Sequence, residues 1–341
     1  MTKRELPYQS LHTHTVDSDG EATHQQVLEA AEANGFGAVA FTDHDTVLSD
    51  ERLRQLREYN GPVDWVSGVE LSSGLPKEQG GGATNNLHVV GLFVDPTNQD
   101  LGEHCRKTHE ARQKRMKAVV ANLNELGFTI TEDDCLEAAG GGSVGRPHIV
   151  EAIHKHQTNQ RVLEELEARV AEDAKHDEQA KQWYDRYQQI IRERPAQRPF
   201  ELFLGNDPYF PALVDFEYWQ DFDSVVSLIR GAGGIALWAH WWTTPEEVDR
   251  DGLADIAEAG RIDGLETSFP LVRDIMDTRE ETLREVAESC GIPGVTAVDL
   301  HALQTFADLA AQSEDAATTT GTVQRLIDAT GVSTEWSSLH Q

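Results

Sequence analysis

Seven short apolar segments alternate with helical patterns along this chain, and this alternation limits the possible folds more than any other feature. The segments lack strict polar alternation, as expected of strands that are covered on both faces. One helical pattern begins at Thr23, a good N-cap, and ends at Gly35. Together these patterns predict a parallel α/β architecture, either a barrel or a doubly wound sheet. The predicted strands are residues 8–11, 38–41, 63–69, 87–93, 235–238, 262–265 and 294–298, and further helices are expected near 49–59, 221–230, 245–259 and 273–289.

The region from about residue 100 to residue 220 interrupts the alternation. It contains a long basic helical pattern up to Leu126, a glycine joint at 140–142, and a charged helical stretch at 161–194. We expect an all-helical insertion after the fourth strand. The predicted domains are residues 1–99 together with 221–341 for the α/β part, and residues 100–220 for the helical insertion.

The charge balance limits the partners of the chain. Acidic residues number 59 against 29 basic residues, a formal net charge of -30, which repels nucleic-acid backbones and anionic membranes. We find no run of about 18 apolar residues and no signal-peptide pattern. We therefore expect a cytoplasmic protein that binds neither membranes nor long nucleic acid. Cys105, Cys135 and Cys290 match no zinc spacing and are expected to be reduced core residues.

Residues of metal-binding types follow the predicted strands. The first strand ends in His12-Thr13-His14, and alternate residues of an extended segment point the same way, so both imidazoles can reach one metal. Six of the seven predicted strands carry His, Asp or Glu at the carboxyl end, and these ends open on one face of a parallel barrel. The fourth strand departs from the pattern, because His88 falls near its start. A lone His-x-His would be weak evidence, but this repetition argues against an accidental alignment.

Nine candidate ligands are too many for a single tetrahedral zinc ion, yet they suit two or three divalent ions that share carboxylates. Two such ions can bind both the attacking and the leaving oxygen of a displacement and activate a shared water. The pattern therefore indicates a hydrolase. The candidates are His12, His14, Asp19, His44, Glu70, His88, His240, Asp299 and His301, whereas His24, His104, His109, His154, His156, His176 and His340 are expected to be ordinary helical or terminal residues.

Seven motifs together resemble the PHP family, the polymerase and histidinol phosphatase domain. The resemblance covers about residues 11–70, 88–148 and 234–301, and it implies a distorted seven-stranded β/α barrel with a trinuclear metal site. Within the family the chain is most similar to nucleotide phosphatases that carry a helical insertion after the fourth strand. The motifs are His12-Thr13-His14, Ser18-Asp19-Gly20, Thr42-Asp43-His44-Asp45-Thr46, Gly68-Val69-Glu70, His88-Val89-Val90-Gly91, Gly145-Arg146-Pro147-His148 and Asp299-Leu300-His301.

The resemblance also implies how the ligands divide among the ions. His12, His14, Glu70 and Asp299 would hold the first ion, Glu70 would bridge to a second ion held by His88 and His240, and Asp19, His44 and His301 would hold a third. Manganese, iron or zinc would suit these ligands, and the sequence does not distinguish them. Trp241 stands where the family often has proline, so Trp238, Trp241 and Trp242 either stack on a base or belong to the core.

Basic residues in the insertion are candidates for binding an anion. Arg112 and Arg115 share one face of a helix at the i, i+3 spacing, although this basic helix could instead pair with acidic neighbours. Arg146 precedes Pro147, which suits the first turn of a helix whose free N–H groups favour anions. His148 could donate a second bond or protonate the leaving oxygen. The resemblance implies a substrate-binding arginine and histidine at these same two positions.

The sequence thus predicts a metal-dependent phosphatase. A hydroxide that bridges the ions would attack a phosphomonoester, and the resemblance implies that this ester belongs to a small nucleotide, such as AMP or a nucleoside 3',5'-bisphosphate. Glu70, Asp299 and His148 would act in catalysis, and Arg146, His148, Arg112 and Arg115 would bind the substrate. Competing hypotheses are a histidinol-phosphate-type or short-oligonucleotide phosphoesterase, an amidohydrolase of cyclic amides, and a non-catalytic metal-binding module. The sequence leaves the oligomeric state open.

Overall fold

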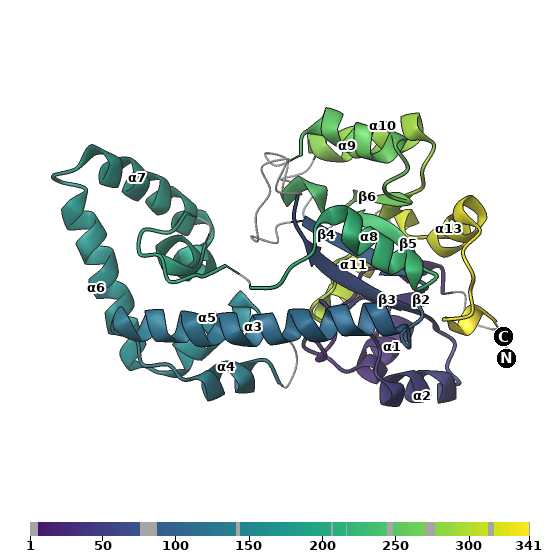
Figure 1. Ribbon diagram of the computed structural model, residues 1–341, viewed down its shortest axis with the longest axis horizontal. Coiled ribbons are helices and arrows are strands. Elements are labelled where there is room, and N and C mark those ends of the chain that lie inside the picture. Colours follow the sequence, from purple (N-terminus) through teal and green to yellow (C-terminus); the bar gives the residue numbers. More distant parts are fainter. Residues whose placement is uncertain are drawn as a thin grey trace. The chain divides into compact units, whose positions relative to one another are not determined.

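A computed structural model describes the chain in eight stretches, residues 6–75, 87–140, 144–205, 207–215, 217–243, 248–269, 277–312 and 317–340. The internal contacts of the chain divide it into two compact units. The first unit comprises Met1–His109 and Tyr218–Gln341, and the second comprises Glu110–Glu217. The first unit carries a β-sheet, and the described residues of the second unit form helices without a strand (Figure 1).

The first unit is built on one seven-stranded sheet in the sequential order β1-β2-β3-β4-β5-β6-β7. All seven predicted strands are present, with ends that differ from the prediction by up to a few residues. The pairs β1–β2, β2–β3, β5–β6 and β6–β7 are parallel. The strands are β1 Tyr8–Ser10, β2 Phe36–Phe41, β3 Asp64–Ser73, β4 Leu87–Leu92, β5 Ile235–Ala239, β6 Gly264–Ser268 and β7 Gly294–Thr296.

Strand β4 corrects the expectation of a wholly parallel sheet, because it runs antiparallel to both β3 and β5. Its first residues therefore lie at the edge where the neighbouring strands end. His88 pairs with Ser72 of β3 and with Ala239 of β5. The position of His88 near the start of its strand, which departed from the sequence pattern, thus places it beside the other strand ends.

The chain segments that follow the first and last strands are hydrogen-bonded to each other. The amide of His14 donates to the carbonyl of Leu300 at 2.8 Å, and the amide of Leu300 donates to the carbonyl of His12 at 3.1 Å. At the other end of the chain, Ser337 forms an antiparallel bridge with Val66 of β3. These bonds bring both the N-terminal and the C-terminal segments onto the sheet.

Helices cover the strands, and α1 begins at Thr23, the cap that the sequence predicts. Thr23 caps α1 with a capping box, and Asp221 caps α8 by accepting from the amide of Ser224. Val27 and Leu28 of α1 pack in one buried cluster with Phe41. The helices of this unit are α1 His24–Ala33, α2 Asp50–Glu58, α8 Phe222–Gly231, α9 Arg250–Glu258, α10 Asp277–Cys290, α11 Gln304–Ala311 and α13 Thr322–Thr330.

Gly91 of β4 lets α8 pack closely on the sheet. A Cβ atom at this position would lie 2.9 Å from Cγ1 of Ile229, which is closer than real contacts allow. We expect Gly91→Ala to lower the free energy of unfolding by about 1–3 kcal/mol, the usual effect of overpacking a core. Gly102→Ala is the control, because its Cβ would meet nothing within 4 Å inside a helix, so it should stabilise the protein by about 0.5–1 kcal/mol. Urea denaturation measures both, and equal effects would contradict this account.

The described residues of the second unit form helices joined by loops, without a strand. Its core contains Leu123, Phe128, Leu166 and Phe203. None of the described helices, in either unit, is long and apolar enough to cross a membrane. The helices are α3 Gln99–Glu125, which begins in the first unit, α4 Glu132–Ala138, α5 Arg146–Lys155, α6 Thr158–Asp173 and α7 Glu178–Glu193, followed by short turns at Pro195–Gln197 and Phe200–Leu204.

Candidate metal centre

The nine predicted ligands lie on the first unit at the ends of its strands. His12 and His14 follow β1, and Asp19 lies in the turn after them. His44 follows β2 and forms a parallel bridge with Glu70 of β3. His88 is the second residue of β4, His240 follows β5, and Asp299 and His301 follow β7.

Five imidazoles converge on the carboxylate of Glu70, whose side chain is fully buried. Its Oε2 lies 3.2 Å from Nε2 of His12, 3.2 Å from Nε2 of His14 and 2.9 Å from Nδ1 of His44. Its Oε1 lies 2.8 Å from Nδ1 of His88 and 2.8 Å from Nε2 of His240. Each oxygen of Glu70 therefore faces a different group of histidines, which is the arrangement of a bridging carboxylate.

Two further carboxylates complete the cluster. Oδ1 of Asp299 lies 3.2 Å from Nε2 of His14 and 3.4 Å from Nε2 of His12. Oδ1 of Asp19 lies 3.5 Å from Nδ1 of His14 and 3.4 Å from Nε2 of His301, while its Oδ2 lies 3.8 Å from Nε2 of His44. The structure thus brings all nine predicted side chains together.

Three overlapping groups of these side chains have ligand atoms within 4.8 Å of one another. The groups share His14 and His44. His14 belongs to two of the groups, and so does His44. The groups are His14, Asp19, His44 and His301; then His12, His14 and Asp299; and then His44, Glu70 and His88.

Two observations indicate that this cluster suits divalent ions. Among the described residues, Oδ1 of Asp19, Nδ1 of His44 and Oε2 of Glu70 are buried without a hydrogen bond. Leaving such atoms unsatisfied is costly, and a cation would satisfy them. The donors are also imidazole nitrogens and carboxylate oxygens, which Mn²⁺, Fe²⁺ and Zn²⁺ accept.

The cluster shifts the pKa values of its own histidines and carboxylates. Burial alone lowers the pKa of His14, but hydrogen bonds to Asp299 and Glu70 outweigh it and raise the pKa to about 10. Burial opposes the ionisation of Glu70, yet His44 and His12 bring its pKa well below the usual carboxyl value. His88 differs, because burial lowers its pKa to about 4 despite the nearby Glu70. Without a metal, His14 therefore holds a proton at neutral pH, whereas His88 is neutral and ready to bind.

Two buried carboxylates outside the predicted set hold the cluster in place. Asp43 accepts from the amide of Thr15 at 2.7 Å and from the hydroxyl of Ser18 at 2.6 Å, which orders the turn that carries Asp19. Glu266 of β6 contacts Nδ1 of His12 and accepts from the amide of His240. Sequence reasoning did not assign either residue a role. The available signals were that Asp43 precedes His44 and that Glu266 ends a strand.

Backbone strain is concentrated at the same edge of the sheet. Four non-glycine residues among those described have positive φ, and three of them lie here. These three are Asp45 at 48°, His240 at 31° and Asp299 at 46°. Such conformations cost about 1–3 kcal/mol each and persist where the surroundings impose them, often at functional sites.

The cluster is open on one side. His12, His14 and Glu70 are almost completely buried, whereas the side chain of Asp299 is 35% exposed and that of His301 is 40% exposed. A substrate would therefore reach the cluster past Asp299 and His301.

The predicted substrate-binding residues all belong to the second unit. Burial lowers the pKa of Arg115 to about 9, and repulsion from Arg146 and Arg112 adds to this shift. The three guanidinium groups are therefore neighbours. Nδ1 of His148, at the start of α5, accepts from the amide of Gly145 at 3.0 Å, and its side chain is largely buried. The prediction that these residues contact the substrate stays a prediction.

The rest of the basic run in α3 follows the second interpretation of this helix, in which basic residues pair with acidic neighbours. Arg106 and Lys107 pair with Glu103. Lys114 pairs with Glu217, and Lys117 pairs with Glu132. The three lysines are exposed and paired with carboxylates, as the second interpretation of this helix expects.

Two of the three tryptophans near His240 belong to the core. Trp238 and Trp241 are buried in the cluster that contains Phe222. The indole of Trp241 donates to the carbonyl of Val248 at 2.7 Å. These two rings are not available to stack on a base, and the side chain of Trp242 lies outside the described residues.

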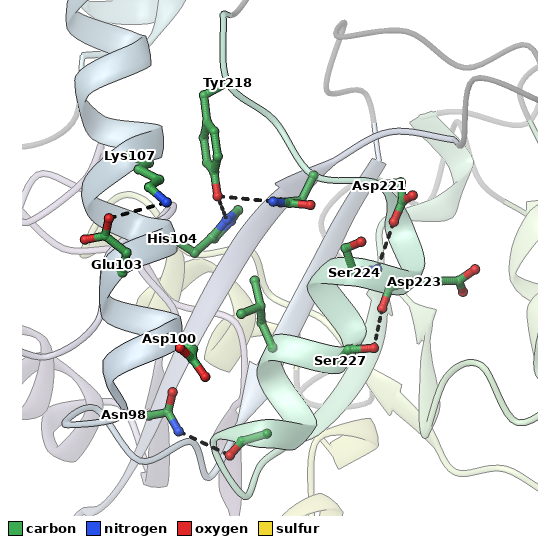
Figure 2. A pocket seen from close by; sticks show the side chains of 13 residues that line it. Asn98, Asp100, Glu103, His104, Lys107, Tyr218, Asp221, Asp223, Ser224 and Ser227 are labelled. Carbon is green, nitrogen blue, oxygen red and sulfur yellow. Dashed lines mark hydrogen bonds and ion pairs between the residues drawn. The ribbon is translucent and has the colours of Figure 1, made fainter.

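A separate cavity of about 610 Å³ lies in the first unit (Figure 2). Residues of α3 and the segment from Tyr218 through α8 line it, and none of them is a predicted ligand. The hydroxyl of Tyr218 lies 3.0 Å from Nδ1 of His104 and accepts from Nε2 of Gln220. These three side chains therefore bond to one another.

Comparison with known proteins yields no matching family model. It does identify curated relatives. The chain is 32% identical to the phosphoribosyl 1,2-cyclic phosphate 1,2-diphosphodiesterase of Eggerthella lenta over 146 residues, 42% of this chain and 53% of that protein. It is 26% identical to the 5'-3' exoribonuclease of Haemophilus influenzae, over 67% of each chain. It is 22% identical to the 3',5'-nucleoside bisphosphate phosphatase of Chromobacterium violaceum, over 67% of this chain and 65% of that one.

The matched part of the chain thus spans about half of the Eggerthella lenta protein and about two thirds of the other two. Two solved structures share the fold. A candidate metal-dependent phosphoesterase from Bifidobacterium adolescentis has a TM-score of 0.62 at 21% identity, over 94% of this chain and 96% of that one. An amidohydrolase from Chromobacterium violaceum has a TM-score of 0.59 at 20% identity, over 86% and 88% of the two chains. The relatives and the shared fold confirm the resemblance to the PHP-type phosphoesterases.

Proposed function

We propose that this chain, a relative of the PHP-type phosphoesterases, removes the phosphate of a phosphomonoester from a small nucleotide, such as AMP or a nucleoside 3',5'-bisphosphate. One observation carries the proposal: five imidazoles face the two oxygens of the buried Glu70. Ions held there would supply a nucleophilic water at neutral pH and would neutralise charge on the phosphate. The similarity to the Chromobacterium violaceum bisphosphate phosphatase supports the choice of substrate.

The residues of the chain have distinct parts in this reaction. His12, His14, Glu70 and Asp299 would hold one ion, with the remaining predicted ligands completing two or three sites. Arg146, Arg112 and Arg115 would bind the phosphate oxygens, because guanidinium groups match them in geometry and charge. Nδ1 of His148 accepts from the amide of Gly145, so the neutral ring carries its proton on Nε2. That atom would donate the proton to the leaving oxygen.

We also propose that the sheet forms a barrel and that the chain carries a helical insertion, as the sequence predicts. The bonds between the segments after β1 and β7 support a sheet that closes into a distorted barrel. Residues 100–220 would form the helical insertion. The charge of -30 and the sequence pattern favour a cytoplasmic location, which we include in the proposal.

Phosphate release tests the proposal. The purified protein, loaded with Mn²⁺, should release phosphate from AMP or adenosine 3',5'-bisphosphate, and the His12→Ala variant should be inactive. A broad panel of phosphate monoesters that yields no phosphate, with bound metal verified by elemental analysis, would contradict it.

A short-oligonucleotide phosphoesterase is the second candidate, because the Haemophilus influenzae relative is an exoribonuclease that matches over two thirds of its length. A 5'-phosphorylated trinucleotide separates the two: an exonuclease releases mononucleotides from it, whereas a phosphatase releases inorganic phosphate. The amidohydrolase and the non-catalytic metal-binding module have less support. Many amidohydrolases bridge their metals with a carboxylated lysine, but none of the lysines lies at a predicted strand end, whereas Glu70 does. The partly exposed Asp299 and His301 differ from the closed shell of a structural metal.

Arg146 offers a test of substrate binding. We expect Arg146→Ala to raise the Michaelis constant for AMP by about 10-fold to 100-fold, because a charged hydrogen bond contributes about 1.5–3 kcal/mol. Competitive inhibition by inorganic phosphate should weaken to a similar extent. Lys117→Ala is the matched control, since Lys117 lies on the same basic helix as Arg112 and Arg115 but pairs with Glu132. Equal kinetics of both variants would remove Arg146 from the site.

A further inference from the structure

Glu266 is a buried carboxylate that touches two predicted ligands at once. It lies in β6, and its side chain is 2% exposed. Its Oε1 lies 2.7 Å from Nδ1 of His12, and its Oε2 accepts from the backbone amide of His240 at 2.7 Å. Both oxygens are thus engaged, and Glu266 belongs to none of the three groups with metal-binding spacing found among the described residues.

The contact with His12 determines which nitrogen of that ring can bind a metal. A carboxylate only accepts hydrogen bonds, so Nδ1 of His12 carries the proton. The other nitrogen, Nε2, lies 3.0 Å from Nε2 of His14 and 3.2 Å from Oε2 of Glu70. The hydrogen bond to Glu266 therefore aims the Nε2 lone pair of His12 into the cluster.

The contact with His240 holds a strained part of the backbone. His240 has φ of 31°, a conformation that non-glycine residues rarely adopt. This bend places its Nε2 2.8 Å from Oε1 of Glu70 and 3.2 Å from Nδ1 of His88. The amide of His240 donates to Glu266, so the carboxylate offsets part of the strain and fixes the direction of the imidazole.

We propose that Glu266 is a positioning residue that sets the ring of His12 and the backbone of His240 for metal binding. This inference rests on the proposed function, because it assumes that the cluster holds divalent ions. It assigns Glu266 a role on both sides of Glu70, since His12 faces Oε2 of that residue and His240 faces Oε1. One carboxylate would therefore influence ions on both sides of the bridge.

The Glu266→Gln variant tests this role with little change of shape. A glutamine side chain has one acceptor oxygen and one donor NH₂ group, so it cannot accept from both His12 and His240. If the NH₂ group faces His12, the ring reverses its tautomer and presents a protonated Nε2 to the cluster. Hydrogen-bond partners of metal-bound histidines typically change metal affinity by about 10-fold to 100-fold. We expect a loss of Mn²⁺ affinity in this range, measured by calorimetric titration of the metal-free protein.

Glu280→Gln is the matched control. Glu280 is also a buried carboxylate beside β6, and it accepts from the amide of Phe269 at 2.7 Å and from the hydroxyl of Ser268 at 3.1 Å. Its second oxygen accepts from Arg284 at 2.7 Å, and none of these three partners is a predicted ligand. The Glu280→Gln variant should bind Mn²⁺ with the affinity of the wild type, even if its thermal unfolding temperature falls.

A second measurement covers the case in which Glu266→Gln does not fold. In the wild-type protein loaded with Zn²⁺, ¹⁵N NMR of the imidazoles should show His12 protonated at Nδ1 and unprotonated at Nε2. The opposite tautomer, or a folded Glu266→Gln variant with unchanged Mn²⁺ affinity, would overturn the inference. Neither readout depends on which ester is cleaved, so a protein that releases no phosphate but meets both expectations would contradict only the proposed function.

Discussion

Glu70→Gln should reduce the turnover number for phosphate release by at least about 10³-fold. Glutamine keeps the shape of the side chain but removes the charge that five imidazoles share. The ions would lose their common ligand, and with it several kcal/mol of transition-state stabilisation, of which each 1.4 kcal/mol corresponds to about a factor of ten. Steady-state kinetics with saturating Mn²⁺, together with elemental analysis of the bound metal, measure the effect.

The expected pattern is a loss of both activity and bound metal in the Glu70→Gln variant. Glu280→Gln removes a buried carboxylate from the same unit and should retain both. A Glu70→Gln protein that keeps its full complement of ions and more than a tenth of its activity would show that Glu70 does not bridge them.

Metal binding should reverse the pH dependence of stability. In the metal-free protein the pKa of His14 is raised to about 10, so its stabilising contribution is complete below 6.5 and is lost as the pH rises towards 10. The pKa values of Glu70 and Asp299 are lowered, so their contributions are present above the ordinary carboxyl values and are lost in acid. The metal-free protein should therefore become less stable between about pH 7 and pH 10, whereas metal affinity should rise about tenfold per pH unit for each proton displaced.

Thermal unfolding with EDTA and with excess Mn²⁺, measured at intervals across this pH range, provides the comparison. The two sets of unfolding temperatures should diverge as the pH rises. Titrations in buffers of different ionisation enthalpy should also show protons released on binding. Parallel pH profiles with no proton release would mean that His14 is not a ligand.

Much of the fold and of the cluster could be predicted because the information is local. Short apolar segments specify the strands, and caps such as Thr23 specify where helices begin. A residue that directly follows a strand lies at its end whatever the details of packing. His12, His14, His44 and the other predicted ligands could therefore be identified without knowing how the strands pair.

The remaining features depend on contacts between distant residues. The direction of β4 depends on pairing with β3 and β5, and an apolar strand looks the same in either direction. The role of Glu266 appears only when His12, 254 positions away, lies beside it. The burial of Trp238 and Trp241 likewise could not be predicted, because an aromatic residue suits a core as well as a binding pocket. Their packing with Phe222 shows that they belong to the core.

The antiparallel pairing of β4 makes the length of this strand critical. Side chains alternate between the two faces of a strand, so a shift of one residue would turn His88 away and present Leu87 or Val89 in its place. The same shift would move all the remaining side chains of β4 to the opposite face of the sheet, including those that pack under α8. Natural variants should therefore tolerate substitutions along β4 far better than a single inserted or deleted residue within it.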